Sequence, residues 1–301
     1  MKKLFYLLTF LSFTLVGCYE PDITEVNLGY NEIFYTTRYN YMLEKDFTEV
    51  AGFGLGLTRC MEHGYENYGY LKFSNTINYI PVSAFKDCAS LQTMYLPSSV
   101  YTIHDSAFYA CSGLIKMDIP QYVSTIGNHA FNGCTSLDSI LIPEYVKTVG
   151  EYAFYRTKWY NNQNEGVLYL DGWCLGYKGV RPSGELKLDS NTRCIANVAF
   201  AYCSDLTRVT IPDNVKRIGT SAFEDCRGLK SITIPKNVES IGDYAFYGTD
   251  INEIYCTAQT PPTIGYYTFA RNWGLKIYVP SEAIELYKTK WPSYAAYIQV
   301  P

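Results

Sequence analysis

The sequence lacks the residue patterns that mark most metal sites and hydrolytic active sites. It has three histidines in 301 residues, and its ten cysteines include no C-x-x-C pair. Zinc sites are usually built from such closely spaced Cys or Cys/His pairs. The sequence also contains no G-x-S-x-G, H-E-x-x-H or phosphate-binding glycine loop. We therefore expect no catalytic residue, no metal and no cofactor, and a chain that acts by binding.

Positive charge is scarce as well. The 25 Lys and Arg residues face 29 Asp and Glu, the formal net charge is −4, and there is no long basic run. Phosphate backbones are bound by concentrated positive charge, so nucleic acid is not an expected partner. What the chain has in quantity is apolar residues, at 48%, and tyrosine, with 30 residues against 4 tryptophans. This composition predicts a folded core and tyrosine-rich surfaces.

The one long apolar run lies at the N-terminus. Two lysines precede the apolar stretch 4–16, which is too short to span a bilayer and is typical of a secretory signal peptide, here residues 1–17. The tetrapeptide Leu15-Val16-Gly17-Cys18 resembles the lipobox of bacterial lipoproteins, which implies acylation of Cys18. The alternative is an ordinary secretory leader in which this cysteine is incidental. Residues 18–30 are then the lipidated cysteine and a short tether.

Acidic residues directly after Cys18 resemble the export signals of outer-surface lipoproteins in Gram-negative bacteria. This resemblance implies a lipid anchor in the outer membrane and exposure at the cell surface, with the periplasmic face left open as the alternative.

A repeat of 23 residues organises the rest of the chain. Apolar residues recur at the same positions of each repeat, which we call columns. The one gap, from 154 to 200, is two periods long, so the repeat positions stay aligned after it. The most regular column is phenylalanine: Phe85, Phe108, Phe131, Phe154, Phe200, Phe223, Phe246 and Phe269. Periods of 20–50 residues are typical of solenoids, in which each coil buries its apolar side against the next.

Within one repeat, alternating residues predict a strand. In the segment 231–234, Ile232 and Ile234 should face inward while Ser231 and Thr233 face outward. Pro235 should end the strand, and Gly242 should mark a second bend where a left-handed backbone is needed. The fold predicted is a β-rich leucine-rich-repeat solenoid of right-handed parallel coils of 23 residues, with ladders of Phe, Leu and Ile as its core.

The repeat unit C-x-x-L-x-x-[IVM]-x-[IL]-P-x-x-V-x-x-[IV]-G-x-x-A-F resembles that of BspA-like leucine-rich-repeat surface proteins over residues 31–301. It departs from the commonest leucine-rich pattern because Pro replaces the usual Asn. The resemblance implies a monomeric surface protein that binds host or extracellular-matrix proteins. The alternative function is a glycan-capturing accessory lipoprotein of a polysaccharide-uptake system.

The domain organisation follows from where the repeat holds and where it fails. Residues 31–70 are expected to cap the first coil, 71–272 to form the solenoid, and 273–301 to cap the last coil with a strand and a short helix. The consensus fails within an insertion at 158–192. There Asp171-Gly172 joins two apolar runs, which predicts a β-hairpin that replaces one coil's usual turn.

Cysteine and histidine are the two candidate types of reactive or metal-binding residue. Cysteines recur at one repeat position, at 88, 111, 134, 203 and 226, and are interpreted as a buried ladder, with disulfides between them left open. His104 and His129 lie one coil apart in the predicted stack. They are interpreted as solvated side chains, with a metal-binding pair as the less favoured alternative.

Aromatic residues concentrate around the interrupted repeat. Tyr and Trp are enriched at binding anchors and also stack on sugars. The alternative is that these rings only pack the hairpin onto the solenoid. The candidate binding surface consists of Tyr122, Tyr145, Tyr152, Tyr155, Trp159, Tyr160, Tyr169 and Trp173, with Tyr177 close by in sequence.

Overall fold

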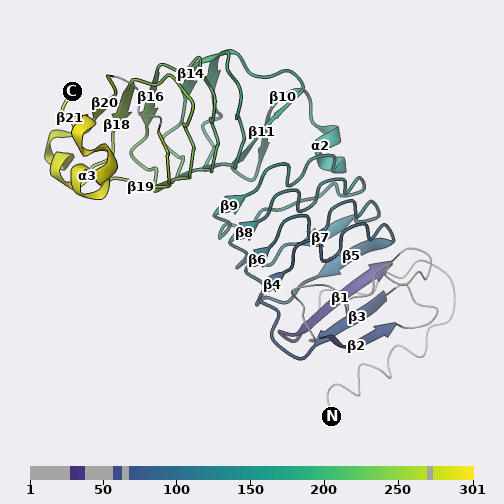
Figure 1. Cartoon of the computed structure of the whole chain (residues 1–301). Helices are drawn as coiled ribbons and strands as arrows, with labels where there is room; N and C mark the ends of the chain where they lie inside the picture. The colour runs from purple at the N-terminus through teal and green to yellow at the C-terminus, as the bar shows by residue number, and fades with distance from the viewer. Residues whose placement is uncertain (1–27, 38–56, 63–67, 270–273) are drawn as a thin grey trace.

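The computed structural model describes residues 28–37, 57–62, 68–269 and 274–301, and these form a solenoid that curves into an arch (Figure 1). The expected signal peptide, Cys18 and the tether up to residue 27 lie outside the described residues. The β-rich solenoid of 23-residue coils predicted from the repeat is confirmed.

Most regular coils contain a longer strand, a turn at proline, a two-residue strand and a turn around the Ala-Phe pair. In the strand Ser231–Ile234 the two isoleucines are buried and the two polar residues are exposed, as expected. After that strand, the Val238 N–H donates to the Pro235 carbonyl at 3.2 Å, so the chain does turn at this proline. Neighbouring coils stack in register and in parallel, with Ile232 opposite Ile254.

The two kinds of strand lie on different sides of the solenoid. In Figure 1 the two-residue strands lie on the inner side of the arch and the longer strands on its outer side. The longer strands are β5 (Leu91–Tyr95), β7 (Lys116–Asp118), β12 (Gly184–Lys187), β14 (Leu206–Thr210), β16 (Ser231–Ile234), β18 (Glu253–Cys256) and β20 (Lys276–Tyr278). The two-residue strands are β4 (Tyr79–Ile80), β6 (Thr102–Ile103), β8 (Thr125–Ile126), β9 (Thr148–Val149), β13 (Cys194–Ile195), β15 (Arg217–Ile218), β17 (Ser240–Ile241) and β19 (Thr263–Ile264).

Phenylalanine ladders form the centre of the core. The rings of Phe85, Phe108, Phe131 and Phe154 stack with centroids 5.2–5.6 Å apart, and those of Phe200, Phe223, Phe246 and Phe269 stack at 5.3–5.6 Å. Among the described residues the buried side chains fall into two clusters, one centred on the coils before the hairpin insertion and one on the coils after it. The core therefore has the same interruption as the repeat.

Cysteine thiols line the core beside the phenylalanines. All eight cysteines whose side chains are described are buried. The Sγ of Cys111, Cys134 and Cys226 donates to a phenylalanine carbonyl of the preceding coil at 2.9–3.1 Å. The ladder is thus an apolar column with a weak hydrogen bond between coils, and these eight cysteines form no disulfide with one another.

The prediction that the repeated glycine adopts a left-handed backbone is wrong. Gly242 does not adopt a left-handed backbone, and the positive φ falls two residues later, at Tyr244 (56°). A Cβ on Gly242 would lie 2.5 Å from the backbone nitrogen of Thr220 in the preceding coil. Close approach between stacked coils therefore requires glycine here, because a side chain would separate the coils.

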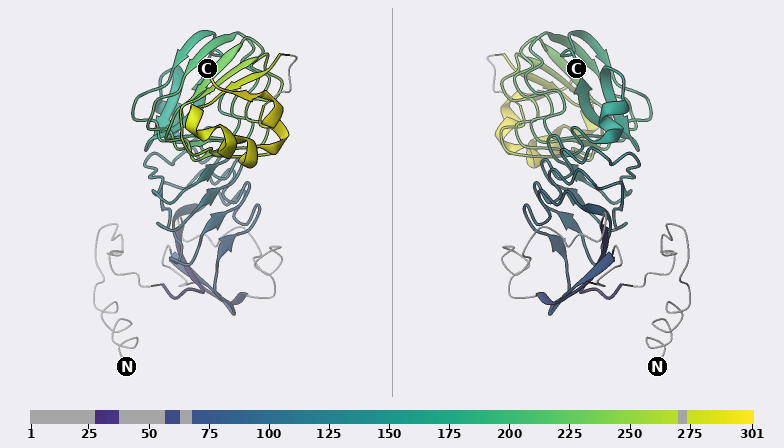
Figure 2. Two further views of the ribbon diagram at one scale, coloured as in Figure 1. Left: turned by 90° about the vertical axis from the view of Figure 1, so that its left-hand side faces the viewer. Right: turned by 90° about the vertical axis from the view of Figure 1, so that its right-hand side faces the viewer.

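Both ends of the solenoid are covered. At the N-terminal end, β1 (Glu32–Thr37) pairs with β3 (Tyr68–Phe73), which pairs with β2 (Leu57–Glu62), and β1 also pairs antiparallel with β5. At the other end lie η4 (Ser281–Ala283), α3 (Ile284–Lys290), η5 (Pro292–Tyr297) and β21 (Ile298–Gln299). Figure 2 shows this C-terminal segment lying across the last coil. Two residues of this segment, Tyr287 and Trp291, are buried in the core.

Candidate functional site: a cleft where the ladder is interrupted

The hairpin predicted from Asp171-Gly172 is present and takes the place of one coil. β10 (Gly166–Leu170) and β11 (Trp173–Lys178) pair antiparallel, and both turn residues have positive φ, 48° and 78°. Such values are typical of the two-residue turns that match strand twist. β11 then pairs in parallel with β13, so it occupies the position of a two-residue strand in the inner sheet.

The coils on either side of the hairpin meet at one edge and separate at the other. On the inner side, the Asn197 N–H donates to the carbonyl of Val149 at 3.0 Å. On the side of the Ala-Phe turns, no ring contact among the described residues joins Phe154 to Tyr177, which stacks instead on Phe200 at 6.5 Å. The solenoid is therefore wedged open at this point.

A short helix that the sequence did not predict closes one end of the wedge. α2 (Lys158–Asn162) begins after Thr157, whose Oγ1 accepts a hydrogen bond from the Tyr160 N–H at 3.1 Å. Capping of this kind stabilises a helix start. At its other end, the Lys178 ammonium of β11 donates to the carbonyls of Tyr160, Asn161 and Gln163 at 2.6–3.1 Å. The hairpin and the helix thus hold each other in place.

The wedge encloses a cleft of about 680 Å³. Its walls come from the last regular coil before the hairpin, from α2, from β11 and from the coil that contains Phe200. The rings that line it are His129, Tyr152, Phe154, Tyr155, Trp159, Tyr160, Tyr177 and Tyr202. We name this feature the ladder cleft. Its volume lies within the range of small-molecule and peptide side-chain sites.

Consecutive ring contacts run along the first wall of the ladder cleft. The centroid distances are 5.6 Å from His129 to Tyr152, 5.2 Å from Tyr152 to Tyr155 and 4.9 Å from Tyr155 to Tyr160. Burial raises the pKa of the Tyr160 hydroxyl, and the neighbouring Tyr155 and Tyr152 add to the rise. The Tyr160 hydroxyl therefore stays protonated at neutral pH and is available as a hydrogen-bond donor.

Cations complete the surroundings of the rings. The Arg156 guanidinium lies 5.3 Å from the Tyr155 ring centroid, and the Lys178 ammonium lies at the same distance from that of Tyr160. Burial is also the main cause that raises the pKa of Tyr177, while a hydrogen bond with Arg181 lowers it. The site therefore offers stacking faces, hydroxyls and a few positive charges, which suits recognition of a neutral or weakly acidic ligand.

Only part of the sequence-derived aromatic surface lies in this cleft. Tyr152, Tyr155, Trp159 and Tyr160 are brought together there. Tyr122 and Tyr145 form an exposed pair elsewhere, with centroids 5.4 Å apart, at the turns after two repeat prolines. The Tyr169 hydroxyl accepts a hydrogen bond from the Asp189 N–H at 3.0 Å and is outside the lining. These three residues therefore do not extend the ring array.

Trp173 does not belong to a binding surface. Its side chain is 3% exposed and packs in the core cluster before the hairpin, while its neighbour Cys174 packs in the cluster after it. Adjacent residues of a strand point to opposite sides, so β11 supplies one buried side chain to each core. For Trp173, the alternative of packing the hairpin onto the solenoid is the observed role.

The lining residues that the sequence did not identify include Tyr202, Arg181 and His129. Tyr177 lies one period after Phe154, so its position in the phenylalanine column was the available signal.

His129 and His104 do not pair, since the His104 ring packs edge-on against Tyr79 and the His129 Nδ1 hydrogen-bonds Asn132 Nδ2 at 2.9 Å. Within the described part of the chain, no group of three or more His, Cys, Asp or Glu residues could hold a metal ion.

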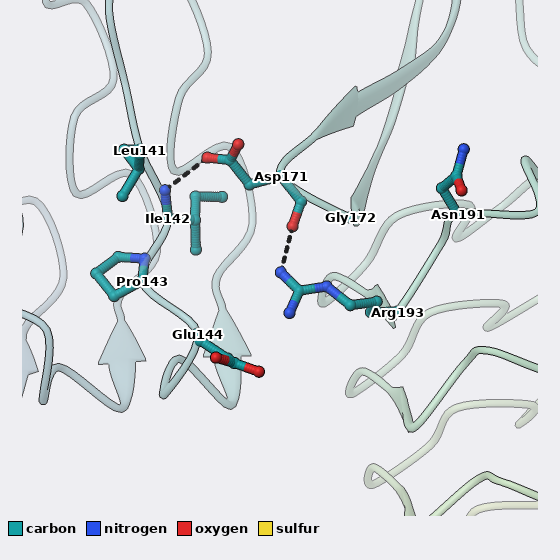
Figure 3. Close-up of a pocket in the computed structure, with 8 residues that line it drawn as sticks. All are labelled: Leu141, Ile142, Pro143, Glu144, Asp171, Gly172, Asn191 and Arg193. Atoms are coloured by element: carbon teal, nitrogen blue, oxygen red, sulfur yellow. Dashed lines mark hydrogen bonds between the residues drawn. The ribbon is translucent and has the colours of Figure 1, made fainter.

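A second, shallower hollow lies at the hairpin turn, with a volume of about 470 Å³ (Figure 3). Asp171 stands between its two walls. The Oδ2 of Asp171 accepts from the Ile142 N–H at 2.7 Å, and its carbonyl accepts from the Arg193 guanidinium at 2.7 Å. These groups satisfy one another and join the two halves of the solenoid, so the hollow is a structural junction.

Comparison with known proteins agrees with the repeat. The family model described as "BspA type leucine rich repeat region" matches residues 63–164 and 183–290, in six copies. No curated protein matches the chain. No helix among the described residues is long and apolar enough to cross a membrane.

Several solved structures of bacterial leucine-rich-repeat proteins are similar to this chain. A leucine-rich-repeat protein from Bacteroides ovatus is 24% identical, with 74% of this chain and 62% of that chain covered and a TM-score of 0.31. A leucine-rich cell-surface protein from Faecalibacterium prausnitzii is 22% identical, with 72% and 59% covered and a TM-score of 0.35. The pneumococcal vaccine antigen PcpA is 18% identical, with 75% and 83% covered and a TM-score of 0.34. The chain thus spans about three-fifths of the length of the first two.

Proposed function

We propose that this chain, which belongs to the family of BspA-type leucine-rich repeat proteins, is a cell-surface binding protein that recognises an extracellular protein through the ladder cleft. The observation that carries the proposal is the ring array beside an open cleft at the one interruption of the ladder. A monomer that acts by adhesion or recognition, with no catalytic step, is the function that this geometry supports best.

The ladder cleft has the composition expected of a protein-binding site. Tyrosine, tryptophan and arginine are the residues that most often dominate binding energy at interfaces. The cleft combines them on rigid elements, because α2 is fixed by Lys178 and the first wall by regular coils. Rigid aromatic side chains lose little conformational entropy on binding, so a modest surface suffices for affinity.

A glycan is the second candidate ligand. Tyr152 and Tyr202 contribute rings to the cleft that are 55% and 52% exposed. Exposed rings of this kind stack on the apolar faces of sugars, as a glycan-capturing lipoprotein of a polysaccharide-uptake system would require. Binding of sugars to this chain would support that second function.

The proposal includes a lipid anchor at Cys18 in the outer membrane of a Gram-negative bacterium, with the solenoid outside the cell. Its support is the lipobox-like sequence and the family membership. Metabolic labelling with radioactive palmitate should mark the wild-type chain and leave the variant Cys18→Ala unlabelled. Label retained by that variant would contradict lipidation at this residue.

The binding function is tested with the full chain purified in detergent, probed against a panel of purified extracellular-matrix proteins and a glycan array. The test variant is Tyr152→Ala with Tyr202→Ala, and the matched control is Tyr266→Ala with Tyr267→Ala, whose side chains are 77% and 62% exposed and lie outside the cleft. We expect the cleft variant to lose about tenfold or more in affinity and the control to bind as the wild type does. Equal binding by both variants would contradict the proposal.

A further inference from the structure

Regular coils on both sides of the ladder cleft use three backbone N–H groups around the Ala-Phe turn to bind the next coil. They belong to alternate residues and donate to three carbonyls one coil further on. In the coil before the cleft, His129, Phe131 and Gly133 donate to the carbonyls of Glu151, Ala153 and Tyr155 at 2.8–2.9 Å. The same three bonds occur from Ser83, Phe85 and Asp87 and from Val198, Phe200 and Tyr202. This row of donors therefore recognises main chain, whatever the side chains.

At the ladder cleft the corresponding row is uncovered. One period on, the donors are the N–H groups of Tyr152, Phe154 and Arg156, and none of them has a hydrogen-bond acceptor among the described residues. The backbone is nevertheless in the same conformation, with φ of 51° at Tyr152 and 58° at Arg156 against 55° at His129. The row is thus preformed and open.

The hairpin explains why the row is uncovered. β11 holds the place of the next coil, but it pairs with β10 instead, with Gly176 opposite Leu168 and Tyr177 opposite Val167. The edge of β11 that would have supplied carbonyls is therefore occupied by β10. The row and the hairpin face each other across the cleft without bonding.

The chain covers the equivalent donor where the solenoid ends. In the last coil the Phe269 N–H donates to the Tyr294 hydroxyl of the C-terminal segment at 3.2 Å. Phe154 occupies the same repeat position and is only 4% exposed. A buried N–H without a partner costs free energy, so an acceptor that reached Phe154 would be favoured.

We infer that the ladder cleft binds an extended peptide segment of the partner protein, whose main-chain carbonyls accept hydrogen bonds from the N–H groups of Tyr152, Phe154 and Arg156. The inference deepens the proposed function and rests on it. Strand addition to an open edge is a recurrent mode of peptide recognition, with affinity from main-chain bonds and specificity from neighbouring pockets. Here an apolar side chain of the peptide would enter the gap between Phe154 and Tyr177, where the phenylalanine ladder lacks a ring contact.

A linear twelve-residue peptide library displayed on phage provides the probe. It is panned on the full chain in detergent, and the most enriched peptide is synthesised for calorimetry and for hydrogen–deuterium exchange. The test variant is Val198→Tyr, since Val198 lines the cleft with φ of 60° and tyrosine occupies the same repeat position at 244 and 267. The matched control is Ser221→Tyr, the same position one coil further on and outside the cleft.

We expect the peptide to bind the wild type, to slow amide exchange in segment 151–157, and to lose about tenfold or more in affinity to Val198→Tyr but not to Ser221→Tyr. The exchange result on the wild type stands even if Val198→Tyr folds poorly. Failure to enrich any peptide, or a bound peptide that leaves exchange in 151–157 unchanged, would overturn the inference. Binding of a glycan that is lost in the Tyr152 and Tyr202 variant would overturn it too, while leaving a binding function for the cleft.

Discussion

The backbone N–H of Asn197 donates to the carbonyl of Val149 at 3.0 Å, across the whole of the hairpin insertion. This bond joins the coils on the inner side of the arch, whereas α2 lies on its outer side (Figure 1). A stack held together at its inner edge and wedged apart at its outer edge must bend there. The bend and the ladder cleft therefore have one cause.

Stacked phenylalanines should dominate the stability of the N-terminal half. Phe131 is 1% exposed and packs between Phe108 and Phe154 at 5.2 and 5.6 Å. We expect Phe131→Ala to lower the free energy of unfolding by about 3–5 kcal/mol, because it removes a buried ring and leaves a cavity. The measurement is urea denaturation followed by circular dichroism. The exposed Tyr101→Ala serves as control, and a loss in Phe131→Ala no larger than in that control would contradict the ladder.

The junction at the hairpin turn should depend on the Asp171 carboxylate. Its hydrogen bond to the Ile142 N–H links the two halves of the solenoid, and its backbone has positive φ. We expect Asp171→Ala to cost about 1–3 kcal/mol in the free energy of unfolding, since it leaves a partly buried donor unpaired. Asp171→Asn keeps both the acceptor and the tolerance of a left-handed backbone, and should cost clearly less. Equal losses in the two variants would show that the bond is unimportant.

Lys178 should matter to the closed end of the ladder cleft. Its ammonium donates to three carbonyls at the end of α2, which has no basic residue of its own in its last turn. We expect Lys178→Met to increase amide exchange in segment 158–163 and to weaken binding of the partner, while the exposed Lys187→Met changes neither. Unchanged exchange in Lys178→Met would mean that α2 is held by other contacts.

Stability should decline in alkaline solution. Burial raises the pKa of the thiols of Cys174, Cys226 and Cys256 to about 12, from 9.0. In the folded chain these thiols keep their protons above pH 9, whereas in the unfolded chain they lose them. Below pH 9 the thiols are protonated in both states and do not change the free energy of unfolding. Above pH 9 the unfolded state binds fewer protons than the folded state, so rising pH favours unfolding. The free energy of unfolding falls between pH 9 and 12 by on the order of 1.4 kcal/mol per pH unit for each thiol.

Urea midpoints measured from pH 7 to 11 check this dependence. The control is Cys226→Thr, because threonine holds the same repeat position at 157 and 249 and its hydroxyl donates to a phenylalanine carbonyl there. This variant should show a shallower fall above pH 9 than the wild type. If the free energy of unfolding fell equally in the wild type and in Cys226→Thr, the alkaline effect would come from other groups, such as the buried tyrosines.

The repeat made most of the fold predictable, and local irregularity hid the rest. Columns such as Phe85 to Phe154 fix the coil length and the core, and Asp171-Gly172 identifies the hairpin. α2 was missed because five residues are too few for a helical period, and its stabilising lysine is distant in sequence. Trp173 was misplaced because an aromatic side chain in an irregular segment gives no sign of which side of its strand is buried. The open donor row could not be foreseen, since it depends on β11 pairing with β10.

The most direct test of the account is amide hydrogen–deuterium exchange of the ligand-free full chain, resolved to single residues by electron-transfer fragmentation. It compares the same three positions in adjacent coils. We predict that the N–H groups of Tyr152, Phe154 and Arg156 exchange about 100-fold faster than those of His129, Phe131 and Gly133, which are bonded to the next coil. Equal protection of the two rows would show that the ladder is closed at this coil and would contradict the cleft.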